Sequence, residues 1–384
     1  MTNFRLHAHK FFDGQCITVH QVLTIADGKI VAIDSDVSTV DEVVQGLVAP
    51  GYIDLQVNGG GGALFNDSPS LNQLETIIAA HAKFGTTGML PTLITDQVSV
   101  MEQAADAMAL AIAEKVPGIL GIHFEGPHLS HAKKGTHAQQ YIRAISNDEW
   151  RILERKDIGQ IIVTLAPETV SVADIERMVT QGIKVCLGHT NADYKTAQAA
   201  MDAGADGYTH LFNAMSAIQS REPGVTGCAL LNDQASCGII IDGHHVDYNI
   251  AKLALKAKPK GKVFLVTDAM PTVGTALTEF SFFDRTVYLN DGRLTSTTGE
   301  LAGAALDMAS AVENTFTHLG VSLEEAIRMA SQYPADYINQ GDIRGNLAIG
   351  SQADFIVLND QLKVQSTWIA GQIIYKESRD TSSK

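Results

Sequence analysis

The stretch PGYIDLQVNGGGG, residues 50–62, decides the fold. Its first part, GYIDLQV, is a short and mostly apolar run, and a run of glycines follows it directly. A short apolar run bounded by glycine is typical of a parallel strand that is buried on both faces. The stretch therefore predicts a buried strand that ends at Gln56-Val57-Asn58 in a glycine-rich loop.

Seven later segments have the same character, and amphipathic helices are predicted between several of them. Eight strands joined by crossover helices favour a (β/α)8 TIM-like barrel over residues 50–345. A doubly wound open sheet is the alternative. The later strand segments are 85–94, 118–126, 160–168, 183–190, 206–212, 237–245 and 262–270, and the helices include 71–84, 98–115, 172–182 and 193–204.

Both ends of the chain consist of short strand-like segments separated by turn pairs such as Asp13-Gly14 and Asp27-Gly28. We expect residues 1–49 and 346–384 to form one small, discontinuous β-sandwich domain. A hairpin with its turn at Asn290-Asp291-Gly292 is predicted within residues 279–298. Two helices, 306–320 and 322–333, are expected to complete the barrel.

The composition limits the class of partner. The formal charge of -15 and the pI of about 5.2 argue against nucleic acid, and an anionic substrate would need a local cationic pocket. The four cysteines form no CxxC pair, so reduced thiols are expected. Neither a signal peptide nor an apolar run long enough for a membrane helix is visible, so we expect a cytoplasmic protein that binds no membrane.

Polar side chains follow the predicted strands where catalytic groups of a barrel lie. Glu125 ends strand three, His189 ends strand five and His210 ends strand six. One such histidine alone is more often a hydrogen-bonded structural residue than a ligand. Two imidazoles and one carboxylate at one mouth, however, form a catalytic metal set with an open fourth position. We expect one divalent ion per chain, with zinc preferred over iron, manganese or cobalt.

Asp268 ends strand eight and is the candidate acid/base residue, although a helix N-cap is the alternative. His137, Arg221 and His245 are candidates for the cationic pocket that an anionic substrate would require. Lys133 and Lys134 lie in a charged loop, and a purely solvated loop explains them equally well.

Taken together, the motifs resemble those of the N-acetylglucosamine-6-phosphate deacetylases of the amidohydrolase superfamily. The resemblance covers nearly the whole chain and keeps the family's order and spacing. The motifs are PGYIDLQVNG, LPTLIT, HFEGPHL, KKGTH, TLAPE, GHTNA, THLFNAM, REPG, DGHHVD, LVTDAM and LAGA.

The resemblance implies metal-dependent cleavage of N-acetylglucosamine 6-phosphate into glucosamine 6-phosphate and acetate. It implies that Asp268 moves the proton and that His137 holds the acetamide and stabilises the oxyanion. It also implies a homodimer, in which the neighbouring chain completes the phosphate site. The implied substrate-binding residues are Thr136, His137, Asn213, Ala214, Arg221 and His245, with Leu301, Ala302 and Gly303 on the acyl side.

Strand one separates this sequence from relatives that hold two metals. Those relatives carry His-x-His, whereas this chain has Gln56 and Asn58, and amide oxygens are poor zinc ligands. Strand four also lacks the lysine that often bridges two metals. A one-metal site on strands three, five and six is therefore predicted. The open alternatives are the galactosamine isomer or another amide as substrate, and a non-catalytic sugar-phosphate-binding protein.

Overall fold

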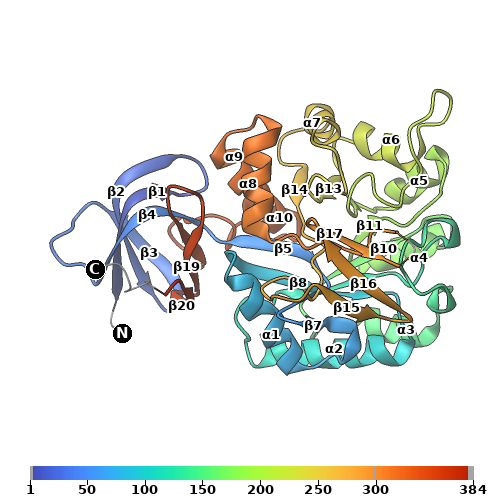
Figure 1. Ribbon diagram of the computed structural model, residues 1–384, viewed down its shortest axis with the longest axis horizontal. Helices are drawn as coiled ribbons and strands as arrows, with labels where there is room; N and C mark the ends of the chain where they lie inside the picture. The colour runs from blue at the N-terminus through green and yellow to red at the C-terminus, as the bar shows by residue number, and fades with distance from the viewer. Residues whose placement is uncertain (1–2, 298, 379–384) are drawn as a thin grey trace.

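The computed structural model describes residues 3–297 and 299–378. Eight parallel strands form a nearly closed barrel in which each strand pairs with the next one along the chain (Figure 1). A bridge between Val57 and Ala269 joins the last strand to the first. The strands are β5 (Tyr52–Val57), β8 (Thr86–Ile94), β9 (Gly121–Glu125), β10 (Gln160–Leu165), β11 (Lys184–Leu187), β12 (Gly207–Tyr208), β13 (Ser236–Ile239) and β14 (Val263–Leu265).

The barrel confirms the predicted fold class. Every residue of β8 is buried, as expected for a parallel strand covered on both faces. Several strands are shorter than predicted, because the polar residues that follow them turn into the loops of the barrel mouth. Only Gly207 and Tyr208 of the segment 206–212 are strand, for example, and His210 lies beyond them.

The helices cover the outside of the barrel, and side-chain caps set where several of them begin. Ser70 caps α1, Asp193 caps α5 and Asp307 caps α8, each by accepting a backbone N–H of the first turn. Gly320 ends α8 in the left-handed conformation, with φ of 74°. The helices are α1 (Leu71–Ala82), α2 (Val98–Ala113), α3 (Asn147–Leu153), α4 (Val172–Thr180), α5 (Tyr194–Asp202), α6 (Gly224–Leu231), α7 (Tyr248–Ala257), α8 (Met308–Leu319), α9 (Leu323–Ala330) and α10 (Gln332–Tyr337).

Strands from both ends of the chain form one separate sheet in the order β20-β19-β18-β4-β1-β2-β3. Its pairs are antiparallel except for β1 with β4. Leu6, Val48, Phe355 and Trp368 share one apolar core, so the two ends stabilise each other. The boundaries at residues 49 and 346 stay a prediction. The strands are β1 (Phe4–Phe12), β2 (Ile17–Ala26), β3 (Lys29–Asp34), β4 (Glu42–Pro50), β18 (Phe355–Leu358), β19 (Val364–Ile369) and β20 (Gln372–Lys376).

A three-stranded sheet follows the eighth barrel strand, where a simple hairpin is predicted. It consists of β15 (Glu279–Phe282), β16 (Arg285–Asn290) and β17 (Arg293–Ser296). The predicted turn is confirmed, with positive φ at both Asp291 and Gly292. A second tight turn at Phe283 adds the extra strand. Phe282 packs with Ile94 and Met270, which places this sheet over the barrel mouth.

Shorter elements complete the mouth: β6 (Gly59–Gly60), β7 (Ala63–Leu64), and 3-10 turns at Phe65–Asp67, His131–Lys133 and Gln139–Tyr141. All four cysteines are unpaired. None of the helices in the described part of the chain is both long and apolar enough to cross a membrane.

Candidate metal centre and substrate cavity

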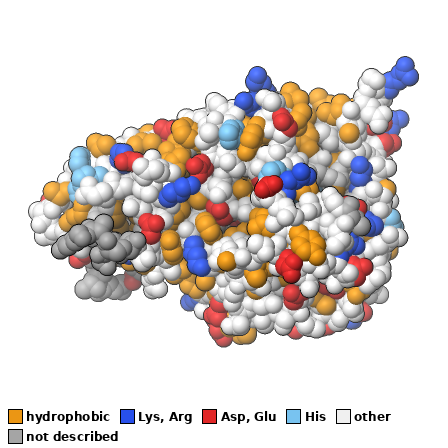
Figure 2. Space-filling model, in the orientation of Figure 1, with side chains coloured by type: hydrophobic (Ala, Val, Ile, Leu, Met, Phe, Trp, Pro, Cys, Tyr) orange, Lys and Arg blue, Asp and Glu red, His pale blue; other side chains and the backbone are white. Residues whose placement is uncertain are grey.

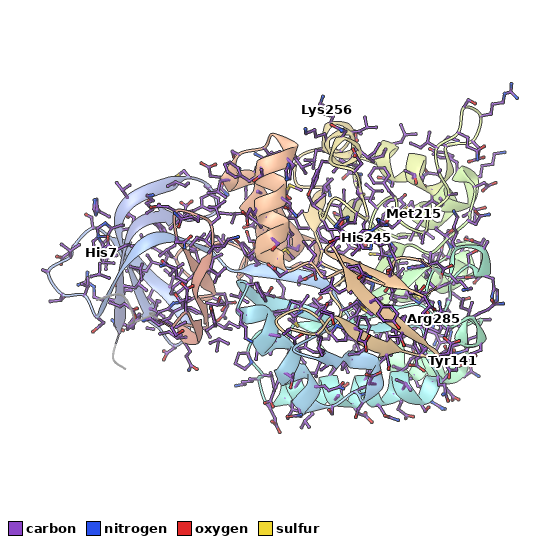
Figure 3. All side chains as sticks on the ribbon, viewed as in Figure 1. His7, Tyr141, Met215, His245, Lys256 and Arg285 are labelled. Carbon is purple, nitrogen blue, oxygen red and sulfur yellow. The ribbon has the colours of Figure 1, made fainter. Side chains whose placement is uncertain are left out.

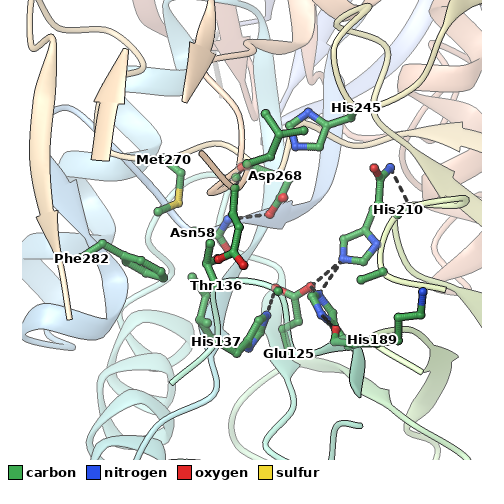
Figure 4. A pocket seen from close by; sticks show the side chains of 18 of the residues that line it. Asn58, Glu125, Thr136, His137, His189, His210, His245, Asp268, Met270 and Phe282 are labelled. Carbon is green, nitrogen blue, oxygen red and sulfur yellow. Dashed lines mark hydrogen bonds and ion pairs between the residues drawn. The ribbon is translucent and has the colours of Figure 1, made fainter. Parts of the chain in front are cut away.

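A cavity of about 460 Å³ opens at the carboxyl end of the barrel strands (Figure 4). It therefore lies where the barrel fold places active sites. Apolar side chains form one part of its wall, including Ile94, Met270, Phe282 and Leu301. The polar residues that line it are Asn58, Glu125, Lys133, Thr136, His137, His189, Asn213, His210, His245, Asp268 and Glu300.

The three predicted metal ligands converge in this cavity. Nε2 of His210 lies 3.0 Å from Oε1 of Glu125 and 3.0 Å from Nε2 of His189. Nε2 of His189 lies 3.3 Å from the same Glu125 oxygen. A tetrahedral zinc ion with bonds of about 2.0–2.1 Å holds its ligands roughly 3.3 Å apart. The donor types and their spacing therefore fit one such ion with little movement.

Neighbouring groups orient these donors. Nδ1 of His189 donates to the backbone carbonyl of Lys133 at 2.9 Å, which leaves the lone pair of Nε2 directed at the cavity. The side-chain amide of Gln56 donates to Oε1 of Glu125 at 3.1 Å. Burial alone would raise the pKa of Glu125, but its close contacts with the imidazoles of His189 and His210 hold that pKa well below its ordinary value. Glu125 is therefore ionised, as a metal ligand must be.

Three of the site residues have backbone conformations that side chains rarely adopt. The φ angles are 48° at His189, 32° at His210 and 53° at Asp268. A non-glycine residue in this region costs on the order of 1 kcal/mol or more. The barrel supports the strain: the amide of Asp268, for example, donates to the carbonyl of Gln56 at 2.9 Å. Each sharp turn occurs where a strand ends and its side chain enters the mouth.

Asp268 lies in the cavity and not on a helix terminus, so the N-cap alternative is wrong. Burial, and then the negative charge of Glu125, raise the pKa of Asp268 to about 6. A carboxyl group that titrates near neutral pH can both accept and return a proton. The structure thus places a carboxyl group that titrates near neutral pH beside the predicted metal ligands.

The two amides of strand one act as hydrogen-bond donors. Nδ2 of Asn58 donates to Oδ1 of Asp268 at 2.6 Å, and Nε2 of Gln56 donates to the same oxygen at 3.2 Å. Gln56 also donates to Glu125, as described above. Strand one therefore holds the two carboxylates of the site in place.

His137 is buried against the metal ligands, and Thr95 sets its tautomer. The Thr95 hydroxyl donates to the backbone carbonyl of Glu125 at 3.1 Å, so it accepts Nδ1–H of His137 at 2.9 Å. Burial, then the charge of His189, lower the pKa of His137 to about 3. The neutral ring thus presents an unprotonated Nε2, 3.9 Å from Oε2 of Glu125. The predicted oxyanion contact needs a donor, whereas this nitrogen is an acceptor.

The predicted cationic pocket is only partly assembled within one chain. His245 lines the cavity, and its Nδ1 donates to Asp242 at 2.7 Å. Arg221 is exposed and is not among the described residues that line the cavity. Lys133 does line the cavity, although the sequence explains it equally well as a solvated loop residue. Its closeness in the chain to Thr136 and His137 is the sequence feature that indicates this position.

The remaining predicted contacts lie mostly at the cavity wall. Thr136, Asn213 and Ala214 line the cavity, as do Leu301 and Gly303. Ala302 differs, because its side chain is buried in the apolar core beneath the three-stranded sheet. Leu301 and Gly303 lie together with Met270 and Phe282, which gives this side of the cavity the apolar character suited to a methyl group.

Comparison with known proteins places this geometry in a family. The profile of the Amidohydrolase family matches residues 47–374. The chain is 46% identical over 367 residues to the N-acetylgalactosamine-6-phosphate deacetylase of Shewanella sp. (strain ANA-3), covering 94% of this chain and 93% of that protein. It is 36% identical over 349 residues to the N-acetylglucosamine-6-phosphate deacetylase of Haemophilus influenzae, covering 88% and 89%. The crystal structure of the N-acetylglucosamine-6-phosphate deacetylase from Pasteurella multocida superposes with a TM-score of 0.92 at 35% identity, covering 97% of this chain and 99% of that one.

Proposed function

Because the chain belongs to the amidohydrolase family, we propose that it hydrolyses the acetamide of an N-acetylhexosamine 6-phosphate. The predicted substrate is N-acetylglucosamine 6-phosphate, which would give glucosamine 6-phosphate and acetate. One observation carries the proposal: Glu125, His189 and His210 converge within 3.3 Å of one another, beside an acid/base carboxylate in the same cavity. The names of the relatives supply the substrate class.

Glu125, His189 and His210 would hold one divalent ion, with zinc preferred, and the ion would supply Lewis acidity toward water and the acetamide carbonyl. The three donor atoms, Oε1 of Glu125 and Nε2 of His189 and His210, lie around one centre at which the ion would bind. The proposal of one metal, not two, rests on strand one. Its side chains at Gln56 and Asn58 donate hydrogen bonds to carboxylates and offer no imidazole nitrogen for a second ion.

Asp268 would take the proton of the attacking water and return it to the leaving amine. Both strand-one amides hold its Oδ1, so Oδ2 is the oxygen that would carry the proton. With a pKa raised to about 6, the group is mostly ionised at neutral pH and is still basic enough to accept a proton. This matches the order of events in amide hydrolysis, in which the nitrogen leaves only after it has been protonated.

His137 would orient the acetamide as an acceptor. Its unprotonated Nε2 can accept the N–H of the substrate amide, which fixes the carbonyl toward the metal ligands. We therefore propose this contact in place of the predicted donation to the oxyanion. Leu301 and Gly303, with Met270 and Phe282, would surround the acetyl methyl group.

The phosphate needs cations, and Lys133 and His245 are the candidates within one chain. We propose that Arg221 completes the site across a homodimer, because it is exposed and is not among the described residues that line the cavity of its own chain. Light scattering would test the dimer. Mixing Arg221→Ala chains with Asp268→Asn chains would test the sharing, since only mixed dimers could regain an intact site. We also propose a cytoplasmic location.

The galacto epimer is a second candidate, and one observation favours it. The Shewanella relative with 46% identity is named for N-acetylgalactosamine 6-phosphate, whereas the Haemophilus relative at 36% is named for the gluco epimer. The two sugars differ only in the configuration at C4, so the metal ligands and Asp268 serve both equally.

One assay tests both candidates. Zinc-loaded protein is given each epimer with and without its 6-phosphate, and acetate release is followed. Fast release from a phosphorylated sugar alone supports the proposal, and the ratio of kcat/KM between the epimers identifies the substrate. If neither phosphorylated sugar releases acetate, the proposed activity is wrong. If a sugar releases acetate equally fast with and without its 6-phosphate, the protein has no phosphate-binding site.

A further inference from the structure

Three histidines lie together on the small sheet, outside the barrel. His7 and His9 belong to β1, and His20 belongs to β2. The antiparallel register pairs Ala8 with Gln21 and Lys10 with Val19, which places His9 next to His20 across the two strands. Leu6 and Ala8 belong to the core of the small sheet, and His7 and His9 alternate with them along β1. The three imidazoles therefore lie together where β1 and β2 pair.

The three rings are close enough to share a ligand. Their centroids are 5.1 Å apart for His7 and His9, 5.7 Å for His7 and His20, and 5.0 Å for His9 and His20. One ring nitrogen from each residue lies within 4.8 Å of the other two. Figure 3 places His7 on the small sheet, far from His245 at the barrel mouth, and Figure 2 shows histidines gathered on this end of the molecule.

His7 carries a buried polar atom without a partner. The residue is only 9% exposed, and its Nε2 has no hydrogen-bond partner among the described residues. The residues paired with it on the neighbouring strands are Val22 and Val43, whose side chains cannot accept or donate a hydrogen bond. Burying an unpaired polar group is unfavourable, and a missing ion is one of the ordinary explanations.

The chemistry of the cluster favours a metal over a simple hydrogen-bond network. Each of the three residues offers one imidazole nitrogen, and imidazole is the commonest transition-metal ligand in proteins. His9 and His20 are more exposed and can rotate, while His7 is held by its surroundings. The ligand nitrogens already lie within 4.8 Å of one another, so small rotations would bring them to the spacing that one ion requires.

We propose that His7, His9 and His20 form a second metal site, separate from the barrel, for a divalent transition ion such as Zn²⁺, Ni²⁺ or Cu²⁺. Three imidazoles without a carboxylate select these ions over Mg²⁺ and Ca²⁺, which prefer oxygen. The net charge of -15 attracts cations to the surface. The ion links β1 to β2, so it stabilises the folded small sheet by binding the native state alone. The fourth position faces solvent.

Metal counting tests the site. Protein without a histidine tag is stripped, equilibrated with zinc at a low free concentration held by a chelator buffer, and analysed for zinc. We expect two ions per chain for the wild type. We expect one ion for His9→Asn/His20→Asn, with acetate release unchanged, because neither residue approaches the barrel cavity. Both substituted residues are partly or fully exposed, so the fold is retained.

Two further variants separate this site from the barrel site. Glu125→Gln/His189→Asn removes two barrel ligands, so it should keep one ion and lose activity. In that background Co²⁺ should still give the absorption of a low-symmetry site, and His9→Asn/His20→Asn should abolish it. His318→Asn, which removes an exposed histidine of α8, is the matched control and should keep two ions. The proposal is wrong if the wild type binds only one zinc ion per chain, or if His9→Asn/His20→Asn still binds two. Neither result bears on the proposed deacetylase function, which acetate release tests separately.

Discussion

Replacing Asp268 by asparagine removes the proton-transfer group while changing the geometry of the site very little. Asparagine has the same shape, and it tolerates the left-handed conformation that Asp268 adopts with φ of 53°. Alanine would add a backbone penalty and would leave the amides of Gln56 and Asn58 without their acceptor. Asp268→Asn is therefore the cleaner variant, since its side-chain oxygen can still accept from strand one.

The expected loss follows from the role of the group. General acid–base catalysis contributes about 10²- to 10⁴-fold, and here one group serves both steps. We expect kcat to fall by at least about 10³-fold, which corresponds to about 4 kcal/mol in the barrier. KM should change by less, and zinc content should stay the same, because Glu125, His189 and His210 are untouched.

The assay combines acetate release with zinc analysis on the same preparation. Asp54→Asn is the matched control, because Asp54 is a fully buried aspartate of β5 that accepts from Thr267 and does not line the cavity. It should keep near-normal kcat. In the wild type, activity should decline as the pH falls through the pKa of Asp268, because protonation removes the base. Near-normal turnover of Asp268→Asn, with zinc retained, would refute the assignment.

Three other changes test separate parts of the structure. Lys133→Ala should raise KM for the 6-phosphate sugar about 10- to 100-fold, because a hydrogen bond to a charged group contributes about 1.5–3 kcal/mol. The control is Lys134→Ala, since Lys134 is the next residue in the chain and does not line the cavity. Equal effects of the two substitutions on KM would exclude Lys133 as a phosphate contact. Thr95→Val should lower kcat/KM about 10-fold without loss of zinc, because His137 loses the acceptor for its Nδ1–H, and Thr95→Ser should restore it. Burial lowers the pKa of His81 to about 4, below its ordinary value near 6.5, so the unfolded chain binds the proton more readily. His81 should therefore contribute about 2 kcal/mol to the fall in the free energy of unfolding between pH 7.5 and pH 5, measured in urea titrations. This share should disappear in His81→Gln, and an unchanged pH dependence in that variant would contradict the expectation.

Periodicity and strand-end chemistry predict the barrel, and they predict that Glu125, His189 and His210 converge at its mouth. The buried strands are continuous apolar runs, and parallel strands bring their carboxyl ends to one mouth, so Glu125, His189 and His210 had to meet if the barrel formed. Local patterns of this kind are encoded within about ten residues. The same reasoning predicts α1, α2 and the turn at Asn290-Asp291-Gly292, since each depends on neighbours in the chain.

What the sequence does not predict depends on distant contacts. The place of Lys133 depends on how a long loop closes over the cavity. The tautomer of His137 depends on Thr95, which lies 42 positions away in the chain. Such features require the folded structure, because residue type alone permits either outcome.

The amides of strand one support the proposal of a single ion in the barrel. Glu125 and Asp268 are two buried carboxylates, and the charge of the first raises the pKa of the second. Nε2 of Gln56 donates to both, at 3.1 Å and 3.2 Å, and Asn58 adds a donor to Asp268 at 2.6 Å. The neutral N–H groups of these amides thus reduce the repulsion between the carboxylates of Glu125 and Asp268. In a two-metal site, the second cation would offset this repulsion. An imidazole at residue 56 would present one ring nitrogen to this space, so it would hold a metal or one carboxylate, but not both carboxylates. The Gln-x-Asn pattern is therefore a coherent alternative to His-x-His, in which strand one positions the carboxylates instead of binding metal.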